Sequence, residues 1–137
     1  MNAASFQEEI FVRRGIFKRE VLKQYNFTCC ISGLRIDSND NVSLVDACHI
    51  EPFSESYNDT ITNGIVLCPN LHRAFDRGLI FINDDYSVHV NNNFTEQYQS
   101  AYNIKQFNNT KIQLPLQSEF YPSIESLYNH RKRFALK

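Results

Sequence analysis

The chain has 137 residues, a length that suits one domain with a single hydrophobic core. Its 42% hydrophobic and 21% charged residues are typical of a globular protein and argue against general disorder. No hydrophobic run approaches the roughly 18 to 20 residues needed to cross a bilayer, and the first residues lack the pattern of a signal peptide. We therefore expect a cytoplasmic protein without a membrane partner.

Charge is distributed unevenly along the chain, although the net charge is only −1. Lysine and arginine gather near both ends, and none lies between Arg35 and Arg73, where aspartate and glutamate accumulate. An acidic middle between basic ends suits a cation site flanked by phosphate-binding arms. Ordinary solvated charge gives the same pattern, and charge alone favours that simpler interpretation.

The chain holds four cysteines, which are Cys29, Cys30, Cys48 and Cys68. They do not form CxxC pairs, so the sequence does not indicate a four-cysteine zinc site. The adjacent Cys29 and Cys30 would point to opposite faces of a strand, a poor geometry for joint chelation. We expect the thiols to be reduced and at least partly buried.

The first third of the chain predicts a helix followed by two strands. An approximate apolar stripe predicts a helix over residues 6–25, which Gly15 could divide into two shorter helices. A short buried strand is expected at 27–31, and a loop at 36–41. Residues 42–50 alternate in hydrophobicity, as a second strand does.

The middle of the chain predicts a strand, a helix and a hairpin in close succession. A polar loop over 51–62 leads into a strand at 63–68. Pro69 suits a first helical turn and Gly78 a C-terminal cap, which together predict a helix of about two turns. The sequence LIFINDDYSVHV, residues 79–90, then predicts a β-hairpin.

The last third of the chain, residues 91–137, is a C-terminal extension that begins with a polar, Asn/Gln-rich stretch. It closes with a helix over 122–134, opened by Pro122 and Ser123. The chain has no internal repeat. We therefore expect a single α+β domain over residues 1–137.

Side chains that could carry chemistry converge between residues 46 and 76. One strand ends in His49, and Asn63 opens the next strand fourteen residues later. The short helix carries His72, nine residues after Asn63, and Asp76, which lies one turn beyond on the same helix face. Strand, loop, strand and helix is the order of a ββα unit, which can bring strand and helix side chains to one pocket.

These residue types suit the hydrolysis of a phosphodiester. A neutral imidazole can deprotonate water near neutral pH. A divalent cation can hold a phosphate oxygen and stabilise the leaving oxyanion, and histidine and carboxylate ligands can hold such a cation with open positions. The Asn63 amide could tie the loop backbone or orient the imidazole.

The segment DACHIEPF…TNGIVLCPNLHRAFDRGLIFI resembles the motif of HNH endonucleases, with His49, Asn63 and His72 as the H, N and H. The resemblance covers about residues 27–83. It is similar in particular to the nuclease module of bacterial restriction-type enzymes. The tail, NIKQFNNTKIQLP…YPSIESLYNHRKRF, resembles the C-terminal extension of such proteins.

The resemblance implies a ββα-metal fold, metal-dependent DNA cleavage and roles for individual residues. It makes His49 the general base that activates water, His72 a metal ligand and Asn63 the positioning residue of the motif. Asp76 stands where colicin-type members place a second ligand on the helix.

The position before the base departs from the family pattern. Many HNH proteins place a metal-binding aspartate or histidine there, whereas this chain has Cys48, a soft ligand suited to zinc and poor for magnesium. Asp46 lies two residues earlier on the same strand face and is the alternative strand ligand. We expect one divalent metal ion, Mg²⁺ or Mn²⁺ before Zn²⁺ or Ni²⁺, held by His72 with Asp76 or Asp46.

Four further residues complete the set of candidates. Arg73 and Arg77 flank the predicted site on the helix, where a guanidinium can grip a phosphate, and solvated helix charge is the alternative. His89 and His130 have no partner at a suitable spacing, so we expect both to be structural.

The sequence therefore predicts a DNA endonuclease, the cleavage module of a restriction-type enzyme. The alternative is a non-catalytic nucleic-acid-binding ββα module with a structural metal site, which a closed coordination shell including Cys48 would favour. DNA is the expected partner. Sequence specificity would come from loops, from a homodimer or from a DNA-reader domain outside this chain, because phosphate contacts carry little sequence information.

Overall fold

The computed structural model describes residues 3–40 and 42–135; residues 1, 2, 41, 136 and 137 lie outside the description. No helix within the described ranges is long and apolar enough to span a membrane. In chain order the elements are α1 (Ala3–Gln24), β1 (Asp46–His49), α2 (Phe53–Ser56), η1 (Ile61–Asn63), β2 (Gly64–Leu67), α3 (Pro69–Asp76), β3 (Ile80–Ile82), β4 (Val88–Val90), η2 (Lys105–Phe107), η3 (Ser118–Phe120) and α4 (Ile124–Ala135).

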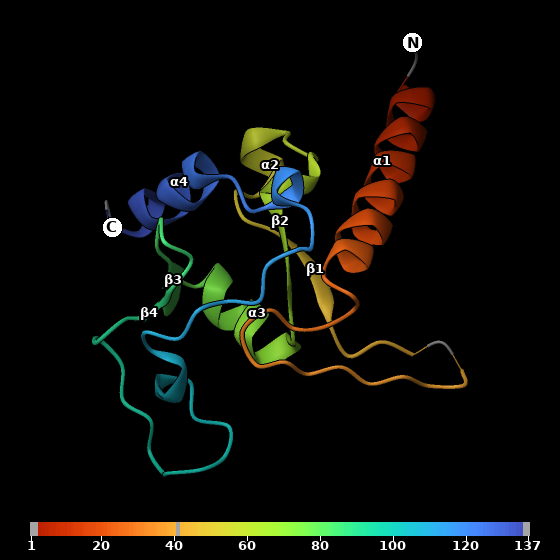
Figure 1. Ribbon diagram of the computed structural model, residues 1–137. Coiled ribbons are helices and arrows are strands. Elements are labelled where there is room, and N and C mark those ends of the chain that lie inside the picture. Colours follow the sequence, from red (N-terminus) through yellow and green to blue (C-terminus); the bar gives the residue numbers. More distant parts are fainter. Residues whose placement is uncertain (1–2, 41, 136–137) are drawn as a thin grey trace.

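A short antiparallel hairpin of β1 and β2 lies at the centre of the molecule (Figure 1). Its register pairs Asp46 with Leu67 and His49 with Gly64. Both α1 and α3 contact the two strands of the hairpin. The N-terminal half of α1 extends away from the rest of the molecule in Figure 1. The predicted ββα unit is therefore present, with α1 added to it.

Gly64 allows α1 to approach the hairpin closely. A Cβ atom at this position would lie 2.5 Å from Cγ2 of Val21 and 2.9 Å from Cζ of Phe17. Both of these α1 side chains are buried against the hairpin. The predicted helix is confirmed as one continuous element, because Gly15 lies within α1 without interrupting it.

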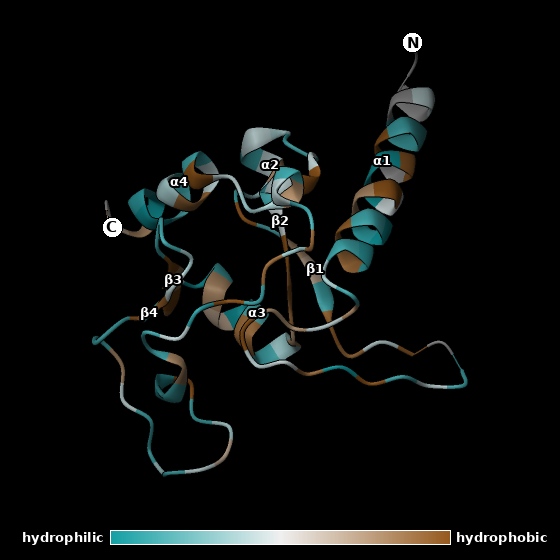
Figure 2. Ribbon diagram, in the orientation of Figure 1, coloured by the Kyte–Doolittle hydropathy of each residue, from teal (hydrophilic) through white to brown (hydrophobic). Residues whose placement is uncertain are grey.

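The helix α3 begins and ends as the sequence predicts. Pro69 occupies its first turn, and Gly78 follows its end with a φ of +74°, a conformation that glycine adopts without strain. The buried side chains of α3 are Leu71, Ala74 and Phe75. In Figure 2, hydrophobic residues are concentrated on β2 and on parts of α3, where these elements meet.

A second hairpin and the last helix complete the core. The strands β3 and β4 pair antiparallel at the predicted place, with Phe81 opposite His89. The closing helix is observed as α4, which packs against β3. Phe134 of α4 lies so close to Gly78 that a Cβ there would be 2.5 Å from its ring.

The strand predicted at 27–31 is wrong. Asn26 and Phe27 both have positive φ and continue the turn that ends α1. A tight turn follows, in which the Gly33 N–H donates to the Cys29 carbonyl at 2.9 Å. Only Cys30 lies along β2, because its N–H donates to the Val66 carbonyl at 2.8 Å.

Two other predicted segments differ from the structure. The strand predicted at 42–50 is limited to Asp46–His49, because β2 offers only four residues to pair with, and Val42 and Leu44 are exposed. The loop predicted at 51–62 contains the short helix α2 and the start of η1.

Candidate active site

Three of the predicted site residues meet at one point between β1 and α3. Asp46 begins β1, and His72 and Asp76 lie one turn apart on α3. Nδ1 of His72 lies 2.9 Å from Oδ2 of Asp46, and Nε2 lies 3.1 Å from Oδ2 of Asp76. The imidazole of His72 therefore bridges two carboxylates from different elements.

This arrangement favours the charged form of His72. The hydrogen bond to Asp76, supported by that to Asp46, raises the pKa of His72 to about 9 against the opposing effect of partial burial. With both ring nitrogens protonated, Nδ1–H donates to Asp46 and Nε2–H donates to Asp76. At neutral pH, His72 is accordingly an imidazolium held between two negative charges.

A cavity of about 330 Å³ opens over this cluster. The lining residues are Asp46, Pro69, His72, Arg73, Asp76 and Arg77. Within the described ranges, Arg73 and Arg77 form no ion pair. Two carboxylates and two free guanidinium groups therefore share one cavity, which suits a cation and an anion bound side by side.

His49 lies at the other end of β1 and does not line this cavity. Its ring stacks on Phe17 of α1, with centroids 3.9 Å apart and planes 5° apart, and Phe53 of α2 lies 5.7 Å away. Nε2 of His49 is buried without a hydrogen-bond partner. A water molecule can therefore approach His49 only at Nδ1.

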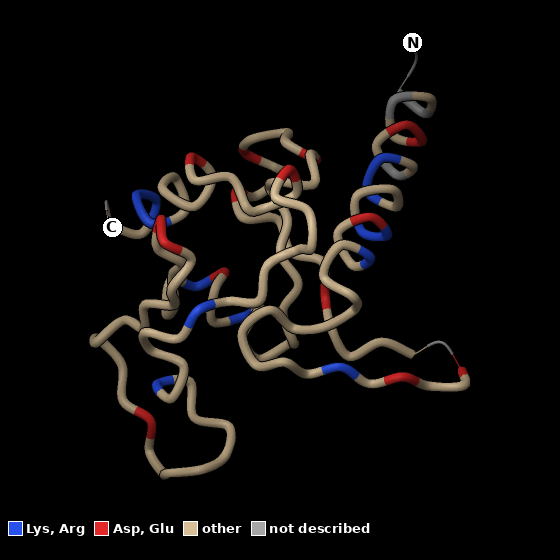
Figure 3. The backbone as a smooth tube through the Cα atoms, viewed as in Figure 1, with Lys and Arg blue, Asp and Glu red and all other residues tan. Residues whose placement is uncertain are grey.

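The surroundings of His49 favour its neutral form. Partial burial, followed by the charge of Arg14, lowers the pKa of His49, whereas Asp59 and Asp76 oppose this effect. The Arg14 guanidinium lies over the Phe53 ring, 5.3 Å from its centroid. In Figure 3, the tube of α1 carries both blue Lys or Arg positions and red Glu positions along its length. A neutral imidazole is the form that a general base requires.

Asn63 is fully buried and all its side-chain hydrogen bonds go to the backbone of the preceding loop. Its Oδ1 accepts from the Glu51 N–H at 3.0 Å, and its Nδ2 donates to the carbonyls of Glu51 and Asn58. Its own carbonyl accepts from the Ile50 N–H. Asn63 thus ties the loop that follows His49, the first of the two uses considered for its amide.

Cys48 lies apart from the cavity. It is buried in the core, and burial raises the pKa of its thiol well above the usual value. The four cysteines are free thiols, of which Cys68 is half-buried and the others are buried. The β1 residue that reaches His72 is Asp46.

The side chains at the cavity are of the types that bind a divalent cation. In residues 3–40 and 42–135, no three His, Cys, Asp or Glu side chains are already placed as a metal-binding cluster. Both ring nitrogens of His72 are engaged by carboxylates. One imidazole and two carboxylates nevertheless suit Mg²⁺, Mn²⁺ or Zn²⁺, and a cation would compete with a proton for His72.

The other two histidines lie outside the site. His130 is buried in α4, stacks on Phe75 at 3.7 Å, and donates from Nε2 to the Phe75 carbonyl. Burial lowers the pKa of His130 to about 4, which keeps it neutral. His89 is exposed on β4.

Sequence reasoning missed the residues that surround His49. Arg14, Phe17 and Phe53 reach it from two helices that are distant in sequence from β1. The spacing of Arg14 and Phe17, three residues apart on a helix, indicates a shared face but not which face packs on the hairpin.

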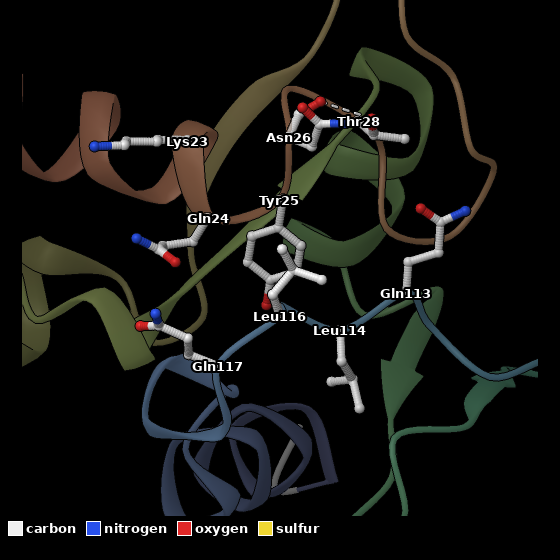
Figure 4. A pocket seen from close by; sticks show the side chains of 9 residues that line it. All are labelled: Lys23, Gln24, Tyr25, Asn26, Thr28, Gln113, Leu114, Leu116 and Gln117. Carbon is white, nitrogen blue, oxygen red and sulfur yellow. Dashed lines mark hydrogen bonds between the residues drawn. The ribbon is translucent and has the colours of Figure 1, made fainter.

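A hollow of about 660 Å³ lies elsewhere, between the end of α1 and the segment before η3 (Figure 4). Amide side chains from Gln24, Asn26, Gln113 and Gln117 surround the ring of Tyr25 there. No histidine or carboxylate lines this hollow. It offers no general base and contains none of the predicted site residues.

Residues 29–83 match the family model described as HNH endonuclease. This segment belongs to the HNH endonuclease family. The matched range agrees closely with the core predicted at 27–83, so the family recognised from its three motif residues is confirmed. No match to a curated protein was found.

The fold of the chain is similar to a solved structure described as a modification-dependent TagI restriction endonuclease. The TM-score is 0.59 at 21% sequence identity, over 85% of this chain and 36% of that chain. The similarity confirms the α+β fold. The chain spans little more than a third of the length of that protein.

Proposed function

We propose that this HNH protein is a metal-dependent DNA endonuclease and that it serves as the cleavage module of a restriction-type enzyme. One observation carries the proposal. A neutral His49 and a charged cluster of Asp46, His72 and Asp76 lie on a single hairpin and its adjoining helix, within the HNH segment. A general base and a cation site are the two parts that phosphodiester hydrolysis needs.

His49 is the general base in this proposal. Its Nδ1 takes a proton from a water molecule, and the oxygen of that water forms the new bond to phosphorus as the bond to the 3′ oxygen breaks. The products carry a 5′-phosphate and a 3′-hydroxyl. Phe17 and Phe53 hold the ring in place and exclude water from its other nitrogen.

Asp46, His72 and Asp76 would hold the divalent cation. When bound, such a cation neutralises charge on the phosphate and on the leaving oxygen. Arg73 and Arg77 line the same cavity and bind phosphate oxygens of the strand. Asn63 positions the loop after His49 through its backbone hydrogen bonds.

In this proposal, recognition of a DNA sequence or a modified base depends on a reader domain or on a second copy of the chain. The solved relative is described as modification-dependent, and this chain corresponds to 36% of its length. Phosphate contacts alone position a nuclease without reading bases. A reader domain or a second copy of the chain would supply the specificity.

The test is plasmid cleavage by metal-stripped protein resupplied with Mg²⁺, Mn²⁺, Ni²⁺ or Zn²⁺ in turn. The wild type should convert supercoiled plasmid to nicked or linear product with at least one ion. His49→Ala should cut at least about 100-fold more slowly, because it lacks the base. His89→Ala, which removes an exposed histidine far from the cavity, should cut like the wild type.

Two results would contradict the proposal. Cleavage by His49→Ala at the wild-type rate would remove His49 as the base. A wild type that binds DNA and cuts it with none of the four ions would favour the non-catalytic module.

A further inference from the structure

The cavity over His72 continues across α3 into a second hollow. This hollow has a volume of about 570 Å³ and shares Pro69, Arg73 and Arg77 with the cavity. Its opposite wall comes from the loop between β4 and η2, through Tyr102 and Ile104. The two guanidinium groups therefore stand on a ridge between the candidate active site and an aromatic side chain.

Tyr102 is a large aromatic side chain that is exposed and yet borders this second hollow. It is 82% exposed, yet it lines both the 570 Å³ hollow and a neighbouring one of about 390 Å³. The hollow of about 390 Å³ is largely apolar, and Ile104 and Phe107 form part of its wall. An exposed aromatic ring between two hollows leaves one face free to stack on a flat ligand.

The loop that carries Tyr102 is held in place by its own hydrogen bonds. The Glu96 carboxylate accepts from the Ile104 N–H at 2.7 Å and from the Lys105 N–H at 3.0 Å. The Lys105 ammonium donates to the Phe94 carbonyl at 2.9 Å. The Glu96 charge that faces the hollow is therefore engaged by the loop itself, and the ring stands on an ordered support.

We propose that Tyr102 is a nucleobase-stacking residue for the DNA strand cleaved at the neighbouring cavity. The inference rests on the proposed function. Arg73 and Arg77 would bind phosphates on the ridge, and the strand would leave the cavity across α3 with a base lying against the Tyr102 ring. Alternating phosphate and base contacts of this kind are how proteins hold a single strand.

Charge favours DNA over other occupants of the groove. The ridge presents two guanidinium groups without carboxylate partners in the described ranges, which suits a polyanion. A second copy of the chain would have to bring an acidic surface to the same ridge. Self-association through Tyr102 is therefore an outcome that the experiment must detect.

Binding is measured by fluorescence anisotropy of a labelled single-stranded DNA oligonucleotide, whose bases are free to stack, in EDTA so that cleavage plays no part. Tyr102→Ala should weaken binding about tenfold, since stacking on an aromatic side chain contributes strongly to each base contact. Tyr102→Phe keeps the ring and should restore binding. The matched control is Tyr98→Ala, which removes an 86%-exposed tyrosine of the same loop that lines neither hollow.

Two further readouts separate stacking from a general disturbance of the loop. The salt dependence of binding should be the same for Tyr102→Ala and the wild type, because no phosphate contact is lost. In cleavage assays, Tyr102→Ala should raise KM more than it lowers kcat. Both results would support a contact with the DNA base beside the cleavage site.

Four outcomes would overturn the inference. Equal affinities of Tyr102→Ala and the wild type would remove the stacking role, as would an equal loss in Tyr98→Ala. A dimer in light scattering that Tyr102→Ala converts to a monomer would assign the ring to self-association. A wild type that neither binds nor cuts DNA would overturn the proposed function as well, whereas the first three results leave cleavage intact.

Discussion

The two histidines of the ββα unit differ in the ionisation that their surroundings favour. His49 and His72 are both half-buried, so burial lowers the pKa of each. The pKa of His49 remains below the ordinary value, with Arg14 adding to the effect of burial. The pKa of His72 rises to about 9, because hydrogen bonds to two carboxylates outweigh burial.

Because burial lowers the pKa of both histidines, the difference between them comes from their charged neighbours. The aromatic and cationic surroundings of His49 keep its ring neutral, as a base must be. The carboxylates beside His72 form a negative site that attracts a proton or a cation. In the proposed mechanism, the four-residue strand β1 separates the proton acceptor His49 from the cation site that includes Asp46.

Removing the two carboxylates beside His72 should abolish the difference in pKa between His72 and His49, because they cause the larger of the two shifts. In the double variant Asp46→Asn/Asp76→Asn, the pKa of His72 should fall from about 9 to no more than its ordinary value, because only burial then acts on it. Metal-dependent plasmid cleavage should fall at least about 100-fold with the loss of charged ligands. Proton NMR titration of His72 and calorimetric titration with Mn²⁺ measure the two effects.

The matched control for the double variant is Asp37→Asn, which removes an exposed carboxylate paired with Arg35 outside the site. It should leave both the His72 titration and metal binding unchanged. Metal binding by the double variant at wild-type affinity would exclude Asp46 and Asp76 from the ligand set.

Gly64→Ala tests the His49 side of the comparison alone. The added methyl group would meet Val21 and Phe17, which must move together with the ring stacked on His49. Overpacking of this kind costs about 1–3 kcal/mol in the free energy of unfolding, measured by urea denaturation. The His72 titration should stay as in the wild type, because Gly64 pairs with His49, at the opposite end of β1 from Asp46.

Gly15→Ala is the control for the same substitution in α1. Apart from the chain neighbours and the backbone of α1 itself, no described atom lies within 4 Å of a Cβ at this position, so the variant should gain roughly 0.5–1 kcal/mol from helix propensity. A Gly64→Ala protein as stable as the wild type would show that α1 does not pack on the hairpin as described.

The sequence predicted the regular part of the site because local rules fix it. The proline and glycine at the ends of α3 set its bounds, and the four-residue spacing places His72 and Asp76 on one face. The hairpin followed from a polar loop between two apolar runs. Asp46 was considered because strand alternation puts it on the face of Cys48, and it does reach His72.

The environment of His49 could not be predicted in the same way. Its neighbours come from α1 and α2, and their contact depends on how these helices pack, which no local spacing encodes. The strand wrongly predicted at 27–31 has a related cause. Cys29 and Cys30 are buried by tertiary packing although Phe27 is exposed, and positive φ values at Asn26 and Phe27 hold the backbone in a turn.

The smallest expected effect concerns the charge beside His49. Arg14→Gln removes a cation that disfavours protonation, so the pKa of His49 should rise. If neutral His49 is the base, the acidic limb of the pH profile of kcat/KM moves to higher pH and the plateau above it is unchanged. Arg13→Gln, which removes a cation already paired with Glu9 at 2.8 Å, should leave the limb in place. An unchanged His49 titration in Arg14→Gln would mean that burial by the aromatic rings alone keeps His49 neutral. The difference between the two histidines would then depend on packing around His49 and on charge around His72.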